Sequence, residues 1–252
     1  MWTCALIRGR DRNFNLAFRR QGFIISIPNQ NATEFVEDRR LDGSKGQWSA
    51  MKVLTVSDVI VPELVRRIRE GRMGKVDLVL SCGDLPPEYL SFLAHGLGAP
   101  LYYVRGNHDI RYDDRPPQGG TGIHCRLVTE RGLRLLGFDG SNWYNGGPNQ
   151  YSETQMQWMV YRMRLALWCR PGPDIVITHA PPRYIHDAED PCHRGFKSFL
   201  GLIRKRQPRY FIHGHVHRHF QDASERVTRM KATQVINTYG DYTFEIEAQR
   251  AV

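Results

Sequence analysis

Arg105-Gly106-Asn107-His108-Asp109 directly follows the apolar run 101–104, and it decides how the rest of the chain is interpreted. It places an amide oxygen, an imidazole and a carboxylate on consecutive residues at the end of a predicted buried strand. Gly106 allows a backbone conformation that a residue with a Cβ would resist, so Asn107 and His108 are expected to project into a cleft. Glycine, asparagine and aspartate also form ordinary turns, and a structural turn is the alternative interpretation.

Four other polar motifs in the chain also follow apolar, strand-like runs. They are Ser57-Asp58, Gly83-Asp84, Thr178-His179-Ala180 and Gly214-His215-Val216-His217. In open α/β sheets, ligands bind in the crevice outside the carboxyl ends of the strands. Five motifs at five strand ends therefore indicate one common site.

From Met51 onward, predicted strands alternate with predicted helices, which indicates an α/β domain with a largely parallel sheet covered by helices. The tail is expected to form an antiparallel hairpin, with strands 233–238 and 242–246 joined by a turn at 239–241. A capping box at 152–155 opens a helix whose methionines are interpreted as core filling. The other predicted strands are 51–56, 76–80, 101–104, 174–178 and 210–212, and the other predicted helices are 59–69, 87–97 and 196–207.

Residues 1–50 are predicted to be an accessory amino-terminal extension, and residues 51–252 the main domain. The extension carries no recognisable chemistry. A β-hairpin of residues 16–18 with residues 23–27 is one possibility for it, a loosely held segment is the other, and residues 42–46 resemble a linker.

The composition indicates a soluble globular protein, with 41% hydrophobic and 24% charged residues. No apolar run reaches the length of a membrane span. The five cysteines are scattered and form no Cys-x-x-Cys pair, which favours reduced thiols and a cytoplasmic location. A net charge of +9 favours phosphorylated or polyanionic ligands. Because the arginines are spread along the chain, nucleic acid is the less favoured partner; the sequence gives no indication of the oligomeric state.

The strand ends supply oxygen and nitrogen donors without sulfur. Such a set suits manganese, iron or zinc better than calcium or magnesium. Six ligands are more than one tetrahedral zinc ion uses, so two divalent ions sharing a carboxylate are predicted. Alternatively, the histidines at 213–219 lie on the surface, where they contact water or bind a metal adventitiously. Neither alternative would explain why the other motifs also follow strands. The candidate ligands are Asp58, Asp84, Asn107, His179, His215 and His217.

The order of these motifs resembles the calcineurin-like metallophosphoesterase superfamily, whose pattern is Asp-x-His, Gly-Asp, Gly-Asn-His-Asp/Glu, a separate His, and Gly-His-x-His. The resemblance extends from Met51 to the end of the chain. It implies a four-layer α/β sandwich, with two central mixed β-sheets flanked by α-helices. It also implies that His108 is the catalytic histidine, donating to a phosphoryl oxygen or protonating the leaving alkoxide. The implied ligands of one ion are Asp58, Asp84 and His217, and those of the other are Asp84, Asn107, His179 and His215, with Asp84 as the bridge.

Two positions depart from the family pattern. Ile60 stands where the first motif normally supplies a second ligand, so the first metal position is expected to be weak or completed by water. Pro87 stands where an aspartate often orients the catalytic histidine, and Glu88 and Asp109 are the candidate substitutes.

The segment 187–195 lies between two ligand motifs and just before a predicted helix. A phosphate is expected to use the free N–H groups of that helix together with His193 or Arg194. The alternative is a surface loop with a capping role.

The resemblance implies a metal-dependent phosphoesterase acting on a phosphorylated small molecule. Hydrolysis of phosphomonoesters or phosphodiesters would proceed by attack of a metal-bound hydroxide, without a covalent phosphoenzyme. A nuclease of the same superfamily is one alternative, suggested by the basic charge. A catalytically degenerate binding or scaffold protein is another, suggested by Ile60. The presence of His108 argues against the scaffold, which needs no histidine at the catalytic position.

Overall fold

The computed structural model describes residues 3–7, 15–20, 23–24, 48–168 and 172–249. The chain divides into two compact units, Met1–Lys45 and Gly46–Val252. In the first unit, β1 (Thr3–Ile7) pairs antiparallel with β2 (Asn15–Arg20), and β2 pairs antiparallel with β3 (Phe23–Ile24). β1 was not predicted. The β2–β3 pairs join Arg19 to Ile24 and Arg20 to Phe23, while residues 25–27 and 42–46 lie outside the described residues.

The second unit contains two mixed sheets, as expected. The five-stranded sheet has the order β16-β4-β5-β6-β7, and only β16 is antiparallel to its neighbour. Its strands are β4 (Trp48–Ser57), β5 (Leu78–Ser81), β6 (Leu101–Tyr103), β7 (Gly120–Gly122) and β16 (Gly240–Gln249).

The six-stranded sheet has the order β14-β15-β13-β12-β9-β8, with an antiparallel strand at each edge. Its strands are β8 (Leu127–Glu130), β9 (Leu133–Phe138), β12 (Ile175–Thr178), β13 (Tyr210–His213), β14 (Val227–Met230) and β15 (Thr233–Asn237). A separate parallel pair, β10 (Ser141–Asn142) and β11 (Gln150–Tyr151), lies in the chain between β9 and the first helix over the six-stranded sheet.

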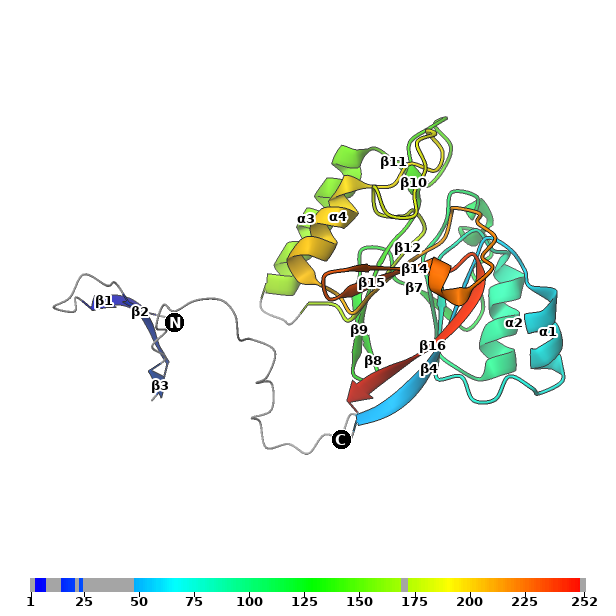
Figure 1. Ribbon diagram of the computed structural model, residues 1–252, viewed down its shortest axis with the longest axis horizontal. Coiled ribbons are helices and arrows are strands. Elements are labelled where there is room, and N and C mark those ends of the chain that lie inside the picture. Colours follow the sequence, from blue (N-terminus) through cyan, green and yellow to red (C-terminus); the bar gives the residue numbers. More distant parts are fainter. Residues whose placement is uncertain (1–2, 8–14, 21–22, 25–47, 169–171, 250–252) are drawn as a thin grey trace. The chain divides into compact units, whose positions relative to one another are not determined.

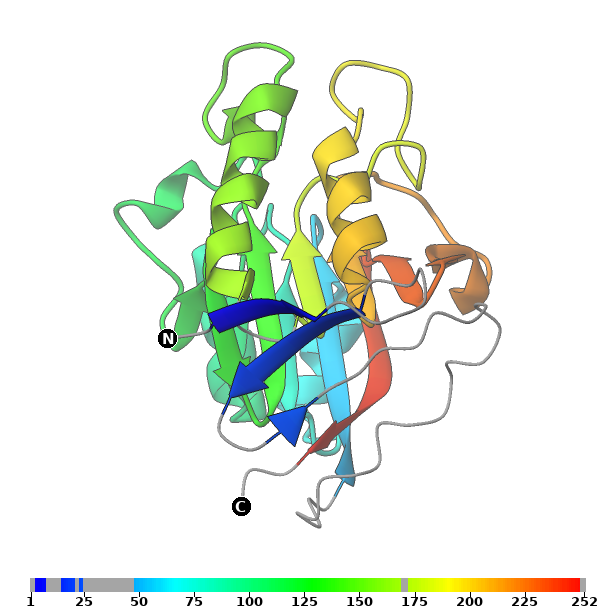
Figure 2. The same ribbon diagram turned by 90° about the vertical axis from the view of Figure 1, so that its left-hand side faces the viewer.

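Helices cover the outer faces of both sheets, so the second unit has four layers (Figure 1). α1 (Pro62–Arg69) and α2 (Pro87–Leu97) cover the five-stranded sheet. α3 (Glu153–Trp168) and α4 (Lys197–Arg206) lie side by side over the six-stranded sheet, as Figure 2 shows. None of the helices in the described part of the chain is long and apolar enough to cross a membrane.

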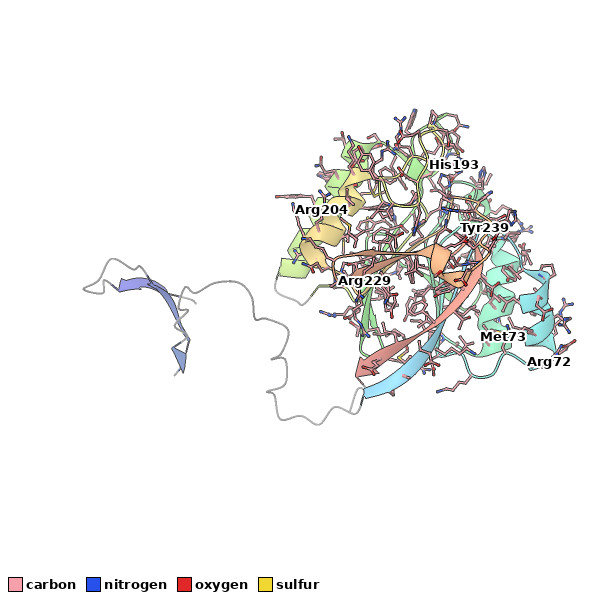
Figure 3. The ribbon with its side chains drawn as sticks, in the orientation of Figure 1. Arg72, Met73, His193, Arg204, Arg229 and Tyr239 are labelled. Carbon is pink, nitrogen blue, oxygen red and sulfur yellow. The ribbon has the colours of Figure 1, made fainter. Side chains whose placement is uncertain are left out.

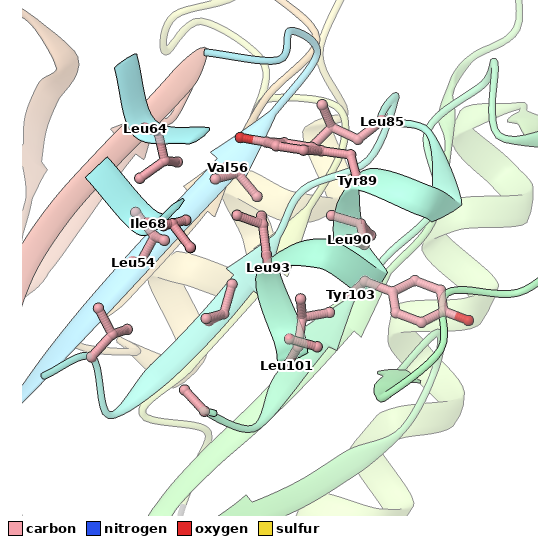
Figure 4. Packing of buried hydrophobic residues seen from close by; sticks show 14 of the residues in the cluster. Leu54, Val56, Leu64, Ile68, Leu85, Tyr89, Leu90, Leu93, Leu101 and Tyr103 are labelled. Carbon is pink, nitrogen blue, oxygen red and sulfur yellow. The ribbon is translucent and has the colours of Figure 1, made fainter. Parts of the chain in front are cut away.

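Three apolar cores separate the four layers. Because successive side chains of a strand point to opposite faces of the sheet, neighbouring residues enter different cores. Leu54 faces α1 and α2, whereas its neighbour Val53 faces the space between the sheets. Val176 similarly packs under α3 and α4, while Ile175 and Ile177 enter the central core. Figure 4 shows leucines of both α1 and α2 packed against β4 and β6.

The predicted hairpin at the end of the chain is wrong. β15 pairs with β13 and β14 in the six-stranded sheet, whereas β16 pairs with β4 in the other sheet. Residues 238–239 carry the chain from one sheet to the other, whereas Gly240 and Asp241, predicted as part of a turn, are the first residues of β16. β16 pairs with all ten residues of β4, and this long pairing explains why it lies in the five-stranded sheet and not beside β15.

The capping box at the start of α3 is confirmed. Ser152 Oγ accepts the N–H of Gln155 at 3.2 Å, and Gln155 Oε1 accepts the N–H of Ser152 at 2.8 Å. Met156 and Met163 are buried in the core beneath the helix, which confirms their assignment as core residues.

Candidate metal centre

The predicted site residues follow the carboxyl ends of strands from both sheets. Asp58, Asp84 and Asn107 come after β4, β5 and β6 of the five-stranded sheet. His179 and His215 come after β12 and β13 of the six-stranded sheet. Because each series of strands is parallel, its ends meet at one edge, and packing of the two sheets brings the edges together.

Three of these residues converge most closely. Asp84, His179 and His215 each offer a donor atom, and the three atoms lie within 4.8 Å of one another. His179 Nε2 lies 3.2 Å from Asp84 Oδ2 and 3.1 Å from Asn107 Oδ1. The structure thus brings together four predicted ligands of the second ion.

Backbone carbonyls orient both imidazoles. His179 Nδ1 lies 2.8 Å from the carbonyl oxygen of Cys82, and His215 Nε2 lies 2.7 Å from that of Cys192. A neutral imidazole that donates its N–H to a carbonyl keeps its other nitrogen unprotonated, which is how metal-binding histidines are usually held. His179 Nε2 and His215 Nδ1 are therefore the nitrogens available to an ion.

The charges at the site are tightly coupled. Burial would raise the pKa of Asp84, but the charge and hydrogen bond of His179 hold it well below its usual range. Burial would lower the pKa of His179, yet Asp84 raises it to about 9. Burial and the charge of His179 lower the pKa of His215 to about 4. The carboxylate of Asp84 is thus ionised and the His215 ring is neutral at pH 7, whereas His179 carries a proton that a metal ion bound at its Nε2 would displace.

The residues present fit a divalent metal. A carboxylate oxygen of Asp84 and the amide oxygen of Asn107 lie 3.2 and 3.1 Å from the same imidazole nitrogen, His179 Nε2. Such an arrangement needs a cation between the donors or a proton on His179. Mixed oxygen and nitrogen donors without sulfur suit manganese, iron or zinc.

Asp58 and His217 form a second group next to the first. The Asp58 side chain is fully buried, and both its oxygens lie 3.1 Å from the backbone N of His215. His217 Nε2 lies 3.4 Å from Asp58 Oδ1, and the His217 ring stacks on Tyr239. The hydrogen bond to Asp58 raises the pKa of His217, and the charge of Asp84 acts in the same direction.

The surface-cluster alternative fails for one of the histidines at 213–219. His213 is completely buried, and its Nε2 lies 3.0 Å from His186 Nδ1. Burial and the neighbouring charge of His186 place the pKa of His213 well below its usual range.

The strand ends are conformationally strained. Asp58, Asp84 and His215 all have positive φ angles, of +66°, +56° and +68°. Non-glycine residues adopt this region at a free-energy cost that the surrounding structure must offset, and such residues concentrate at functional sites.

Gly106 is required for a different reason from the one predicted. Its φ is not in the left-handed region, but a Cβ there would lie 2.0 Å from Asp84 Oδ1. Gly83 is equally constrained, because its Cβ would lie 2.3 Å from the backbone N of Gly106. Close packing of these two turns therefore excludes a side chain at either glycine.

Asp109 ties the same two turns together. Its Oδ2 accepts the N–H groups of Asp84 and Gly106 at 2.7 and 2.8 Å, and its Oδ1 accepts that of Leu85 at 3.2 Å. Burial raises the pKa of Asp109 to about 6, although the Gly106 hydrogen bond opposes the shift. Through both oxygens, Asp109 therefore holds the backbone of the two turns in place.

Asp109→Ala is expected to lower the free energy of unfolding of the metal-free protein by roughly 3 kcal/mol or more. It leaves three N–H groups without their acceptor, and each unsatisfied buried group costs about 1–3 kcal/mol. Urea denaturation measures the change, with Asp109→Asn as the control that keeps one acceptor oxygen. A loss below about 1 kcal/mol would contradict this role.

His108 lies at the edge of the ligand group. Its side chain is exposed, and its backbone N–H donates to Asp84 Oδ1 at 2.9 Å. It lines a pocket of about 220 Å³ together with Asp84 and Arg111. The other candidate orienting residue, Glu88, is paired with Arg111.

The two residues predicted to contact phosphate, His193 and Arg194, lie in different surroundings. The His193 ring lies 5.3 Å from that of His215, so the structure does place it beside the ligand group. Figure 3 shows His193 and Tyr239 in the upper half of the domain, whereas Arg229 and Met73 lie in the lower half. Arg194 is exposed and donates to the carbonyl oxygen of Glu189.

The helix N-terminus invoked for phosphate binding is already occupied. Glu153, from α3, accepts the N–H groups of Lys197 and Ser198 at the start of α4, both at 2.8 Å. A carboxylate at this position is favoured by the helix dipole. The expectation of free N–H groups there is therefore wrong, because a residue 44 positions earlier in the chain supplies the cap.

Sequence reasoning did not identify several contacts of the site. The carbonyl groups of Cys82 and Cys192 orient the imidazoles, and Tyr144 OH lies 3.1 Å from Asn107 Nδ2. Carbonyl oxygens carry no sequence signal. Loops often carry binding residues, but no sequence pattern distinguishes Tyr144 from its neighbours in its loop.

Residues 51–219 match the family model described as calcineurin-like phosphoesterase. One solved structure is similar over 81% of this chain and 100% of its own, with 16% identity and a TM-score of 0.57. TT1561 of Thermus thermophilus has 15% identity and a TM-score of 0.52, covering 76% of this chain and 90% of its own. Vps29 of Entamoeba histolytica, in complex with zinc, has 12% identity and a TM-score of 0.37, covering 75% of this chain and 74% of its own. No curated protein matches the chain.

Proposed function

Because the chain belongs to the calcineurin-like phosphoesterase family, we propose that it is a metal-dependent phosphoesterase that hydrolyses phosphorylated small molecules, either monoesters or diesters. One observation carries the proposal. Asp84 Oδ2 and Asn107 Oδ1 lie 3.2 and 3.1 Å from His179 Nε2, with His215 in the same cluster as Asp84 and His179, and with the His108 N–H bonded to Asp84. Family membership alone would not distinguish an enzyme from a degenerate scaffold.

The ligands divide between two positions that share Asp84. Asn107, His179 and His215 would complete one position, and Asp58 with His217 the other. Two divalent ions, of manganese, iron or zinc, would supply an activated water molecule and neutralise charge on the phosphoryl oxygens. Asp84 suits the shared role because its Oδ2 faces His179 of one position and its charge also acts on His217 of the other.

His108 would act on the substrate rather than on a metal. Its exposed ring can reach a bound phosphoester, while its backbone N–H is fixed to Asp84. From there the imidazole would donate a hydrogen bond to a phosphoryl oxygen or a proton to the leaving alkoxide. His193, whose ring is tilted against that of His215, would contact the substrate from the loop before α4. Arg194 would add positive charge at the rim of the site.

The test is metal analysis of the purified protein, combined with turnover of a generic aryl phosphate in the presence of manganese. Bound divalent metal together with turnover supports the proposal. Metal binding without turnover across monoester and diester substrates would favour the scaffold. The observation behind that second candidate is Ile60, whose apolar side chain, 41% exposed, cannot act as a ligand.

Ile60→His is expected to lower the manganese concentration needed for full activity. The first position has only Asp58, Asp84 and His217 from the protein, and an added imidazole would strengthen ligation there. Activity is titrated against manganese after chelator treatment, for wild type, Ile60→His and the control Ile60→Ala. Retention of two ions by the wild type through chelation would show that another residue already fills the position.

A further inference from the structure

The loop between β10 and β11 supplies a residue that contacts a proposed ligand without being one. Asn107 Nδ2 donates to the hydroxyl oxygen of Tyr144 at 3.1 Å. The other end of the same amide, Asn107 Oδ1, lies 3.1 Å from His179 Nε2. Tyr144 and His179 thus contact opposite ends of one side chain.

The two ends of an asparagine amide are not equivalent for metal binding. The oxygen offers lone pairs to a cation, whereas the NH₂ group offers only donors. Rotation of the amide by half a turn would direct the NH₂ group at the ion. The Tyr144 hydroxyl is also hydrogen-bonded to the Cys192 side chain. With its own O–H engaged there, its oxygen serves Asn107 only as an acceptor, and it opposes a rotation that would direct the amide oxygen at it.

The loop that carries Tyr144 is rigidly supported. Gln150, which is buried, accepts the backbone N–H groups of Tyr144 and Asn145 at 3.1 and 3.2 Å. Gln150 Nε2 also donates to Asn145 Oδ1 at 2.6 Å. Gln150 lies inside the protein while Asn145 is exposed, and the three hydrogen bonds made by Gln150 fix the backbone of the loop at Tyr144.

The loop is also fixed to the turn from which Asn107 projects. Asn149 Nδ2 donates to the carbonyl oxygen of Gly106 at 3.0 Å, and the N–H of Gly140 donates to that of Arg105 at 2.7 Å. Hydrogen bonds thus hold both the loop that carries Tyr144 and the turn that carries Asn107, and together they fix the distance between the two side chains.

We propose that Tyr144 is a positioning residue that holds the Asn107 amide with its oxygen toward the metal position, and so sets the affinity of that position. The inference rests on the proposed function, since it takes Asn107 as a ligand. It adds a residue that the family pattern of ligands and catalytic histidine does not contain.

The first experiment compares manganese binding by wild type and Tyr144→Phe, using calorimetric titration of chelator-treated full-length protein. Loss of an outer hydrogen bond to a ligand typically weakens metal binding 10–100-fold, and we expect roughly a tenfold loss. Tyr102→Phe is the matched control, because its hydroxyl bonds Glu130 instead. Circular dichroism and the melting temperature of the metal-free variants show whether each is folded.

The second experiment removes the asymmetry on which the inference depends. A carboxylate has two equivalent oxygens, so its rotation changes nothing for the ion. The effect of Tyr144→Phe on manganese affinity should therefore shrink to less than about twofold in the Asn107→Asp background. A general loosening of the loop would weaken binding in both backgrounds alike.

The outcomes separate this inference from the proposed function. Manganese binding by wild type with unchanged affinity in Tyr144→Phe would overturn the inference alone. An equal loss in the Asn107 and Asn107→Asp backgrounds would also overturn it, because Tyr144 would then act by another route. Absence of manganese, iron and zinc binding by folded wild type would overturn the proposed function, and the inference with it.

Discussion

Asp84→Ala is expected to abolish phosphoester hydrolysis and to remove bound metal from both positions. The carboxylate is the proposed shared ligand, and its Oδ2 faces His179 at 3.2 Å. No neighbouring carboxylate can replace it, because Asp58 is already the proposed ligand of one position and Asp109 is engaged by three backbone N–H groups. Metal content by elemental analysis and turnover of an aryl phosphate measure the two effects.

Asp84→Asn removes the negative charge and keeps a side chain of nearly the same size. The amide oxygen of the asparagine can still accept the His108 N–H, so the turn is preserved. Metal content and turnover should fall nearly as far as in Asp84→Ala, with a smaller change in melting temperature. Full metal content with normal turnover in either variant would contradict the two-metal assignment.

His108→Ala is expected to reduce turnover roughly a hundredfold or more while leaving the bound metals in place. Its ring is exposed. The contact described between His108 and a proposed ligand is made by its backbone N–H, which alanine retains. His95→Ala is a matched control, because His95 is an exposed histidine on α2 whose ring contacts Ser91 of the same helix.

The informative measurement is turnover per bound ion. A catalytic group that touches the substrate lowers this ratio, whereas a ligand lowers the metal content instead. If His108→Ala loses metal and keeps its turnover per ion, His108 is a ligand and the assigned role is wrong.

The strands that carry the site could be predicted from the sequence alone. The apolar runs before Asp58, Asp84, Asn107, His179 and His215 are all strands in the structure. These assignments are local, because a short apolar run ended by polar residues specifies a buried strand and the place where it stops. The motif order was enough to indicate the family and its two mixed sheets, both of which are confirmed.

Which distant groups meet could be learned only from the packing of the whole domain. β16 joins β4 and not the adjacent β15, since pairing along ten residues outweighs proximity in sequence. Glu153 occupies the N-terminus of α4, and Tyr144 meets Asn107 across 37 positions of sequence. Strand identity depends on neighbours along the chain, whereas hydrogen-bond partners depend on how whole layers pack. The sequence therefore indicated the candidate ligands, and packing determined what orients them.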